Sequence, residues 1–164
     1  MFLIGLGNPG KKYHNNRHNV GHKLVDYLKS KNIKMELLKT DCFMNVSGSF
    51  VKKIISCLKI KTEELIIAHD DLDIPLGSFK IQKAEGPKLH YGLVSIEKAL
   101  KTKNFWRIRI GVDNRLPQNR VEGETYVLQD FLPQELEILK NQVFPKILGR
   151  LKTVLEKTNN SQND

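Results

Sequence analysis

The chain has 164 residues, of which 40% are hydrophobic, and this is enough for one domain with a sizeable core. Lys and Arg number 27 against 18 Asp and Glu, and the resulting net charge of +9 points to a polyanionic partner as readily as to a Lys-rich solvated surface. No apolar run approaches the roughly 20 residues of a membrane span, and Cys42 and Cys57 fit no metal or redox spacing, so we expect a reduced, intracellular protein.

The first third of the chain predicts a strand, a helix and a second short strand. Residues 2–6 form an apolar run that ends in Gly and Pro at residues 7–10, which predicts a buried strand followed by a loop rather than a targeting peptide. A helix is expected next, with Asn19 as its N-cap and with apolar positions at Val20, Leu24, Val25 and Leu28. Residues 35–38 predict a short strand.

The middle of the chain repeats this alternation. Residues 43–44 read as the end of another strand, and Ser47 is the expected cap of a second helix, whose apolar positions are Val51, Ile54, Ile55 and Leu58. Residues 65–68 predict a buried strand that runs into an acidic cluster. After a turn, residues 79–82 predict a return strand.

The last third begins with a loop at residues 83–91 and a helix with apolar positions Leu93, Ile96 and Leu100. Residues 106–112 alternate in a strand pattern that places two cations, Arg107 and Arg109, on one face. A polar loop spans 113–124, and a helical region begins at Pro133.

Strands and helices interleave along the whole chain without a linker or an internal repeat. This pattern predicts a single α/β domain over residues 1–157. Residues 158–164 are expected to form a polar, disordered tail.

A glycine-rich segment, Gly5-Leu6-Gly7-Asn8-Pro9-Gly10, follows the first predicted strand. It formally matches a dinucleotide-binding motif, but the helix in that motif begins inside the glycines, and here it begins near Val20. We therefore disfavour a dinucleotide site. Asn8 can offer its amide as donor and acceptor, although Asn before Pro is also an ordinary turn residue.

His18 and Asp70 are the candidate catalytic pair. If the strands at residues 2–6 and 65–68 are parallel neighbours, their following loops share one edge of the sheet, and Asp70 can orient His18 and stabilise its protonated form. The simpler alternatives are a surface histidine and a solvated acidic turn. A Mg²⁺ site from Asp70, Asp71 and Asp73 is disfavoured, because two of these residues are adjacent and the other candidate ligands are rich in nitrogen.

Several further segments, taken in order with the two above, resemble the bacterial-type peptidyl-tRNA hydrolase family. The matching stretches are 5–10, Tyr13, 17–21, 43–48, 69–75, 90–93, 107–112 and 126–128. The resemblance implies a single-domain α/β fold with a mixed, mostly parallel sheet flanked by helices, usually in a monomer. It implies hydrolysis of the ester between a peptide and tRNA, which rescues tRNA from stalled or aborted translation, without a metal or a cofactor.

By this resemblance, His18 is the general base that activates water, Asp70 keeps it proton-accepting, and Asn8 lies by the scissile bond. The resemblance also implies a substrate site, lined by Tyr13, Phe43, Met44, Asn45, His90 and Tyr91. The net positive charge then has a use, since cations can hold acceptor-stem phosphates. The candidates are Lys80, Lys83, Lys88, Arg107, Arg109, Arg115 and Arg120.

The chain departs from the family pattern in three places. Tyr91 replaces an asparagine that contacts substrate, residues 83–89 are poorer in glycine than the family's loop, and the stretch from 18 to 44 is short, as if a hairpin of the sheet were trimmed. These departures keep a second hypothesis open, a non-catalytic RNA-binding relative that retains the fold and the basic surface. A generic esterase for small substrates is a third hypothesis, but such an enzyme would not need a net charge of +9. The expected location is the cytoplasm, with the mitochondrial matrix as the alternative.

Overall fold

Five strands form one mixed sheet in the order β2-β1-β3-β5-β4. The structure is a computed structural model that describes residues 1–160, except for the side chains of 119 and 156–160. All neighbouring strands are parallel except β4, which pairs antiparallel with β5. The strands are β1 (Phe2–Gly5), β2 (Glu36–Lys39), β3 (Leu65–Pro75), β4 (Phe79–Lys83) and β5 (Trp106–Asp113). This is the mixed, mostly parallel sheet that the resemblance implied.

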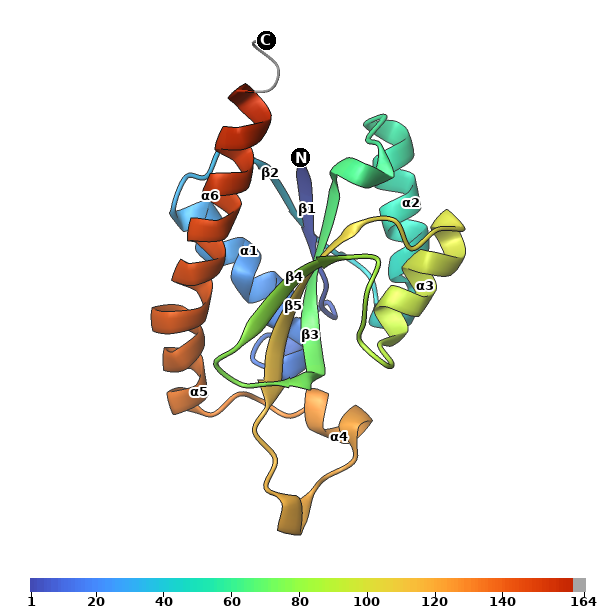
Figure 1. Cartoon of the computed structure of the whole chain (residues 1–164). Coiled ribbons are helices and arrows are strands. Elements are labelled where there is room, and N and C mark those ends of the chain that lie inside the picture. The colour runs from blue at the N-terminus through green and yellow to red at the C-terminus, as the bar shows by residue number, and fades with distance from the viewer. Residues whose placement is uncertain (161–164) are drawn as a thin grey trace.

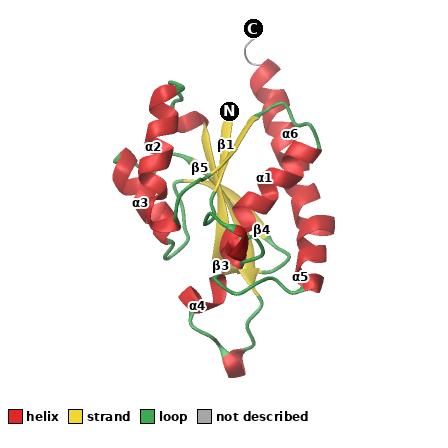
Figure 2. Cartoon of the chain, turned by 180° about the vertical axis from the view of Figure 1, so that it is seen from behind, coloured by secondary structure: helices red, strands yellow, loops and turns green. Residues whose placement is uncertain are grey.

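Helices cover both faces of the sheet, so the molecule has three layers (Figures 1 and 2). Helices α1 and α6 lie on one face, and α2 and α3 pack together on the other. The short helices α4 and α5 lie beyond the carboxyl ends of the parallel strands (Figure 1). The helices are α1 (Val20–Ser30), α2 (Ser47–Cys57), α3 (Tyr91–Leu100), α4 (Gly123–Val127), α5 (Pro133–Ile138) and α6 (Phe144–Asn160).

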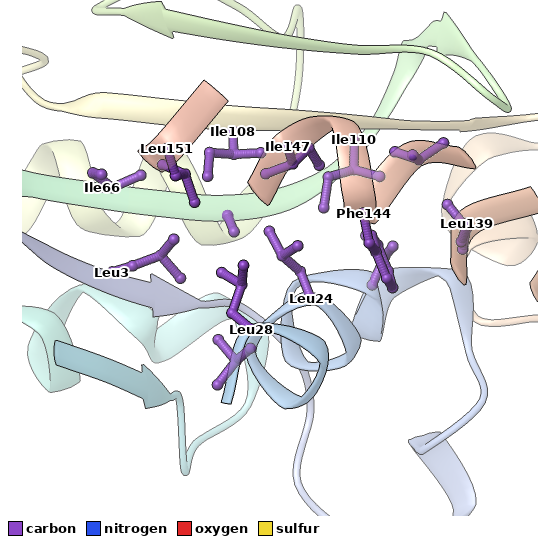
Figure 3. Packing of buried hydrophobic residues seen from close by; sticks show 14 of the residues in the cluster. Leu3, Leu24, Leu28, Ile66, Ile108, Ile110, Leu139, Phe144, Ile147 and Leu151 are labelled. Carbon is purple, nitrogen blue, oxygen red and sulfur yellow. The ribbon is translucent and has the colours of Figure 1, made fainter. Parts of the chain in front are cut away.

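Each face of the sheet has its own apolar core, because side chains along a strand point alternately to opposite faces. Figure 3 shows the core beneath α1 and α6, where Leu3 and Ile66 of the sheet meet Leu24 and Ile147 of the helices. On the other face, Ile4 and its neighbours meet α2 and α3. No helix among the described residues is both long and apolar enough to cross a membrane.

Some predicted elements differ from those observed. Residues 43–44 do not end a strand but begin a 3-10 turn at Met44–Val46, and Ser47 is the first residue of α2 rather than its cap. The predicted loop over 113–124 contains a further 3-10 turn and ends where α4 begins. Helix α6 continues through residues 158–160 of the expected tail, whereas 161–164 lie outside the described residues.

The parallel register of β1 and β3 determines where the segments of His18 and Asp70 lie. Phe2 pairs with Leu65 and Gly5 with Ala68, in parallel, so the loops after both strands leave the same edge of the sheet. Strand β3 also runs seven residues further than the predicted 65–68, to Pro75, alongside β5. The histidine and carboxylate segments therefore meet at this edge.

Candidate active site

His18 and Asp70 form a buried pair at the carboxyl edge of the sheet. His18 lies in the 3-10 turn Arg17–Asn19 before α1, and Asp70 lies in β3. His18 Nδ1 is 2.8 Å from Asp70 Oδ1, and the exposed fractions of the two residues are only 9% and 2%. Because an ionised carboxylate can only accept, Nδ1 carries the proton, and Nε2 of neutral His18 is left as the basic nitrogen.

A second imidazole donates to the same carboxylate oxygen. His90 Nε2 lies 2.9 Å from Asp70 Oδ1, and His90 Nδ1 accepts a hydrogen bond from the backbone N–H of Leu93 at the start of α3. These two bonds fix His90 as the tautomer with its proton on Nε2. His90 was expected to bind substrate, whereas the structure places it at 6% exposure as a support for Asp70.

The electrostatics of the pair suit a base. Burial acts to lower the pKa of His18, but the charge of Asp70 and the hydrogen bond from Nδ1 outweigh it, so the pKa is raised above its ordinary value. For Asp70, burial acts to raise the pKa, but the two imidazoles hold it well below its usual range. Asp70 is therefore ionised at neutral pH, where it stabilises a protonated His18.

The Asn8 side chain is oriented by the loop that follows β2. Its Oδ1 accepts a hydrogen bond of 2.8 Å from the backbone N–H of Met44, which leaves the two Nδ2 hydrogens for a ligand. Asn19 holds the Asn8 backbone on both sides, since its Oδ1 accepts from Asn8 N and its Nδ2 donates to Asn8 O, each at 2.9 Å. Asn19 was expected to be only a helix cap.

Two aromatic side chains stand beside this loop. Tyr13 and Phe43 make an edge-to-face contact with ring centroids 6.2 Å apart, and Phe43 is 53% exposed. Asn45 is exposed on the following 3-10 turn, while Met44 is buried in the core. An apolar shelf with an exposed amide next to it can bind part of an organic substrate.

The peptidyl-tRNA hydrolase family model matches this chain over residues 2–36 and 28–164. The chain belongs to the peptidyl-tRNA hydrolase family. A peptidyl-tRNA hydrolase of Thermodesulfovibrio yellowstonii is 34% identical, and the match covers 99% of this chain and 97% of the relative. A chloroplastic peptidyl-tRNA hydrolase of Arabidopsis thaliana is 36% identical over 84% of this chain and 54% of its own length. The crystal structure of peptidyl-tRNA hydrolase from Acinetobacter baumannii superimposes with a TM-score of 0.84 at 27% identity, covering 98% of this chain and 90% of that one.

In this member of the peptidyl-tRNA hydrolase family, three of the seven predicted phosphate ligands are engaged inside the protein. Arg109 Nε donates to Asp71 at 2.7 Å, Arg115 Nε donates to Asp113 at 2.7 Å, and Arg107 donates to Glu97 at 2.9 Å.

The prediction that Arg107 and Arg109 bind phosphate is corrected, because the exposed fractions of these two residues are only 3% and 8%. Arg107 also donates to the carbonyl of Gly86, which ties it to the loop before α3. Lys80, Lys88 and Arg120 are exposed and Lys83 is half-buried, so these four remain available to a phosphate, although Arg120 also donates to Asp113 at 3.1 Å.

Tyr91 does not point into the protein. It is 48% exposed, and its hydroxyl donates to the carboxylate of Glu124 in α4, which joins the start of α3 to the 113–128 segment. The hydrogen bond to Glu124 raises the pKa of the Tyr91 phenol.

One set of residues has the donor atoms for a metal ion. The ligand atoms of His18, Asp70 and His90 all lie within 4.8 Å of one another. Both imidazole N–H groups already donate to Asp70, however, so a metal would have to replace the protons that orient the base. The carboxylates of Asp71 and Asp73 lie outside this set and accept from Arg109 and from the Lys88 backbone N–H, respectively.

Sequence reasoning missed two residues that support the His18–Asp70 pair. Arg17, which immediately precedes His18, is buried against the C-terminal segment, and its Nη2 donates to Glu135 at 2.6 Å. His69 is fully buried beside His90, with ring centroids 4.9 Å apart. Burial lowers the pKa of His69 to about 3, so it is a neutral packing partner. The signals in the sequence were the adjacency of Arg17 to His18 and of His69 to Asp70, and the place of both residues in the stretches that match the family.

Proposed function

We propose that this protein hydrolyses the ester bond between a peptide, or an N-blocked aminoacyl group, and tRNA, and so recycles tRNA from aborted translation. The observation that carries the proposal is the 2.8 Å contact between His18 and Asp70 in a chain of the peptidyl-tRNA hydrolase family. The net charge of +9 fits a polyanionic substrate.

The chemistry begins with neutral His18. Its Nε2 takes a proton from water as the water oxygen attacks the ester carbonyl carbon, and Asp70 stabilises the imidazolium that forms. The tetrahedral intermediate then collapses and breaks the bond to the ribose 3′ oxygen. That oxygen receives the proton from His18, and the products are a free peptide carboxylic acid and tRNA with a 3′ hydroxyl.

The negative oxygen of the intermediate needs a hydrogen-bond donor. The Met44 N–H is already bonded to Asn8 Oδ1, which removes it as a candidate. The Nδ2 groups of Asn8 and Asn45 are the candidates that remain, and Asn8, being fixed by Asn19 and Met44, is the better pre-organised of the two.

The peptide portion of the substrate is assigned to the apolar shelf of Tyr13 and Phe43, and Tyr91 is assigned to the same substrate site. The acceptor stem is assigned to the four predicted cations that remain available at the surface, namely Lys80, Lys83, Lys88 and Arg120. Such contacts are largely independent of sequence and sensitive to salt. We assign the protein as a monomer that acts where translation takes place, with the bacterial cytoplasm ahead of the mitochondrial matrix.

A single-turnover assay with N-acetyl-aminoacyl-tRNA tests the proposal. Wild-type protein should release the acyl group, and His18→Ala should abolish release while retaining the fold and tRNA binding. His14→Ala is a matched control, since His14 is an exposed histidine in the same loop. Full activity of His18→Ala would end the assignment of the base.

A second candidate function is RNA binding without turnover. It is favoured by Tyr91, whose hydroxyl is bonded to Glu124 at the position where the family pattern has a substrate-binding amide. Tight tRNA binding by wild-type protein with no release of the acyl group selects this function.

A further inference from the structure

Arg107 is a buried cation that the mechanism above does not use. It lies inside the sheet on β5, where its backbone pairs with Ile67 of β3 on one side and with Gln82 of β4 on the other. Its side chain points to the face that α3 covers, and the residue is only 3% exposed. A buried guanidinium needs hydrogen bonds and a counter-charge to compensate its lost hydration. The contacts of Arg107 therefore show which segments it holds together.

The two contacts of this guanidinium lie on either side of His90 in the chain. Nη1 donates to the carbonyl of Gly86, in the loop before His90. Nη2 donates to the carboxylate of Glu97 at 2.9 Å, in the helix that follows His90. Because the donors of a guanidinium have a fixed planar arrangement, these bonds fix the loop and the helix relative to each other. One side chain of the sheet thus holds the segments that enter and leave His90.

The same loop is attached to the sheet at two further points. Gly86 has a φ of +53°, and a Cβ at this position would collide with the guanidinium of Arg109, so the backbone lies directly on that side chain. The backbone N–H of Lys88 donates to Asp73 Oδ2 at 2.8 Å. The loop is therefore anchored to β5 and β3 just before it reaches His90.

Hydrogen bonds, more than close packing, position His90 on this side. A cleft of about 180 Å³ lies between the loop and α3, and Gly86, His90, Glu97 and Arg107 all belong to its walls. An open space of this kind provides few of the contacts that hold a side chain in a close-packed interior. The bonds from Arg107 to both flanking segments are then what keeps the histidine in place.

We propose that Arg107 is a positioning residue for the hydrolytic reaction. It holds His90 where Nε2 donates to Asp70 Oδ1 at 2.9 Å, and the same oxygen accepts from His18 Nδ1 at 2.8 Å. A displaced His90 therefore changes the carboxylate that orients the base. A misplacement of about 1 Å in a catalytic group lowers a rate by roughly 10²-fold. The proposal rests on the proposed function, in which His18 is the base.

Arg107→Met in the full-length protein tests this role, because Met fills apolar space but makes neither hydrogen bond. In hydrolysis of N-acetyl-aminoacyl-tRNA, kcat should fall roughly 10- to 100-fold while KM changes less than about twofold, since the variant disturbs the base and leaves the residues assigned to substrate. A phosphate contact at Arg107 would give the opposite pattern, a raised KM with kcat retained.

A second variant and a matched control accompany this substitution. Gly86→Ala disturbs the same contact from the loop and retains the charge of Arg107, so it should also lower kcat and leave KM. It keeps the proposal testable if Arg107→Met does not fold. Lys103→Gln is the control, because Lys103 Nζ lies 3.6 Å from the Glu97 carboxylate but its side chain is 71% exposed. It removes one positive charge beside the same carboxylate and should hydrolyse as wild type does.

Imidazole NMR signals distinguish this proposal from the proposed function, because they do not depend on turnover. The signals of His90 and His18 should shift in Arg107→Met and in Gly86→Ala but not in Lys103→Gln. Unchanged signals in the folded Arg107 variant, or a change in KM alone, would overturn the positioning role. Shifted signals in a protein that cleaves no acyl-tRNA support the positioning of His90 and refute the hydrolase. Full cleavage by Arg107→Met supports the hydrolase and refutes the positioning role.

Discussion

Arg17 and Glu135 form a buried ion pair, with 2.6 Å between Nη2 and Oε2, although 118 positions separate them. Arg17 also donates to the carbonyl of Asp130 at 2.7 Å and stacks on Tyr126, with Cζ 4.2 Å from the ring centroid. Helix α5 and the segment before it are in this way joined to the turn that contains His18. His18 is therefore held on two sides, by Asp70 through its ring and by the C-terminal segment through Arg17.

This relationship predicts a large effect of Glu135→Gln on stability. The substitution leaves the Arg17 charge buried without its counter-ion, and breaking such a pair costs about 3 kcal/mol. Urea denaturation at pH 7 measures the loss. Glu137→Gln in the same helix is the control, because Glu137 is exposed, and it should change the free energy of unfolding by less than about 0.5 kcal/mol. Equal stability of the two variants would show that the pair contributes nothing to the fold.

The sequence pattern predicted the two apolar strands at residues 2–6 and 65–68, whereas the mixed, mostly parallel sheet was implied by the family resemblance. On the condition that these two strands are parallel neighbours, the pattern also placed His18 near Asp70, and the structure meets that condition. The structural role of Arg107 and Arg109 could not be predicted from the sequence. An alternating pattern predicts a strand, but it does not reveal which face of the strand another segment covers. Here Gln82 of β4, Gly86 and Glu97 cover it.

His90 illustrates a second limit of the sequence. Its type and position were compatible with substrate binding, with helix capping and with support of a carboxylate. The structure shows that His90 has the last two of these roles. Its Nδ1 accepts from the backbone N–H of Leu93 at the start of α3, and its Nε2 donates to Asp70.

Asp70→Asn should change the pH dependence of hydrolysis. In the wild type, activity requires neutral His18, so the rate should rise with pH through a pKa above 6.5, the ordinary value for histidine. Asparagine removes the charge that raises this pKa, and the midpoint should move to lower pH. The rate at the plateau should fall by roughly 10²–10⁴-fold, because the imidazolium that forms loses its charged partner. Profiles of kcat/KM from pH 5 to 9 measure both effects, and an unmoved midpoint contradicts the assignment.

His22 predicts a loss of stability in acid. Its pKa is about 4 in the folded protein and ordinary, near 6.5, in the unfolded chain, so between these values the unfolded state binds more protons. The contribution to stability is thus complete above pH 6.5 and is lost as the pH falls towards 4, by an amount on the order of 3 kcal/mol. His22→Asn should flatten the dependence of unfolding free energy on pH across this window, as measured by urea denaturation at pH 4.5 and 7. An unchanged slope in His22→Asn would show that His22 is not the origin of the acid sensitivity.

Tyr91 offers a test of how far the substrate site has diverged. Tyr91→Asn supplies the amide of the family pattern and releases Glu124, so kcat/KM for N-acetyl-aminoacyl-tRNA should rise severalfold through a lower KM. Tyr91→Phe also releases Glu124 but supplies no amide, which makes it the matched control. If both variants improve equally, the gain comes from freeing α4 and not from the amide.

Salt dependence tests the revised set of phosphate contacts. Lys88 is exposed in the loop that Arg107 anchors through Gly86, so Lys88→Gln should weaken tRNA binding and reduce the slope of log Kd against log salt by about 1. Lys34→Gln is the control, because residue 34 precedes β2 and lies at the amino edge of the parallel strands, away from the site. Both variants remove one positive charge, so a general effect of net charge would change both slopes alike. A change confined to Lys88→Gln assigns the contact to the face that carries the 83–90 loop, and identical slopes in the two variants rule out a phosphate contact at Lys88.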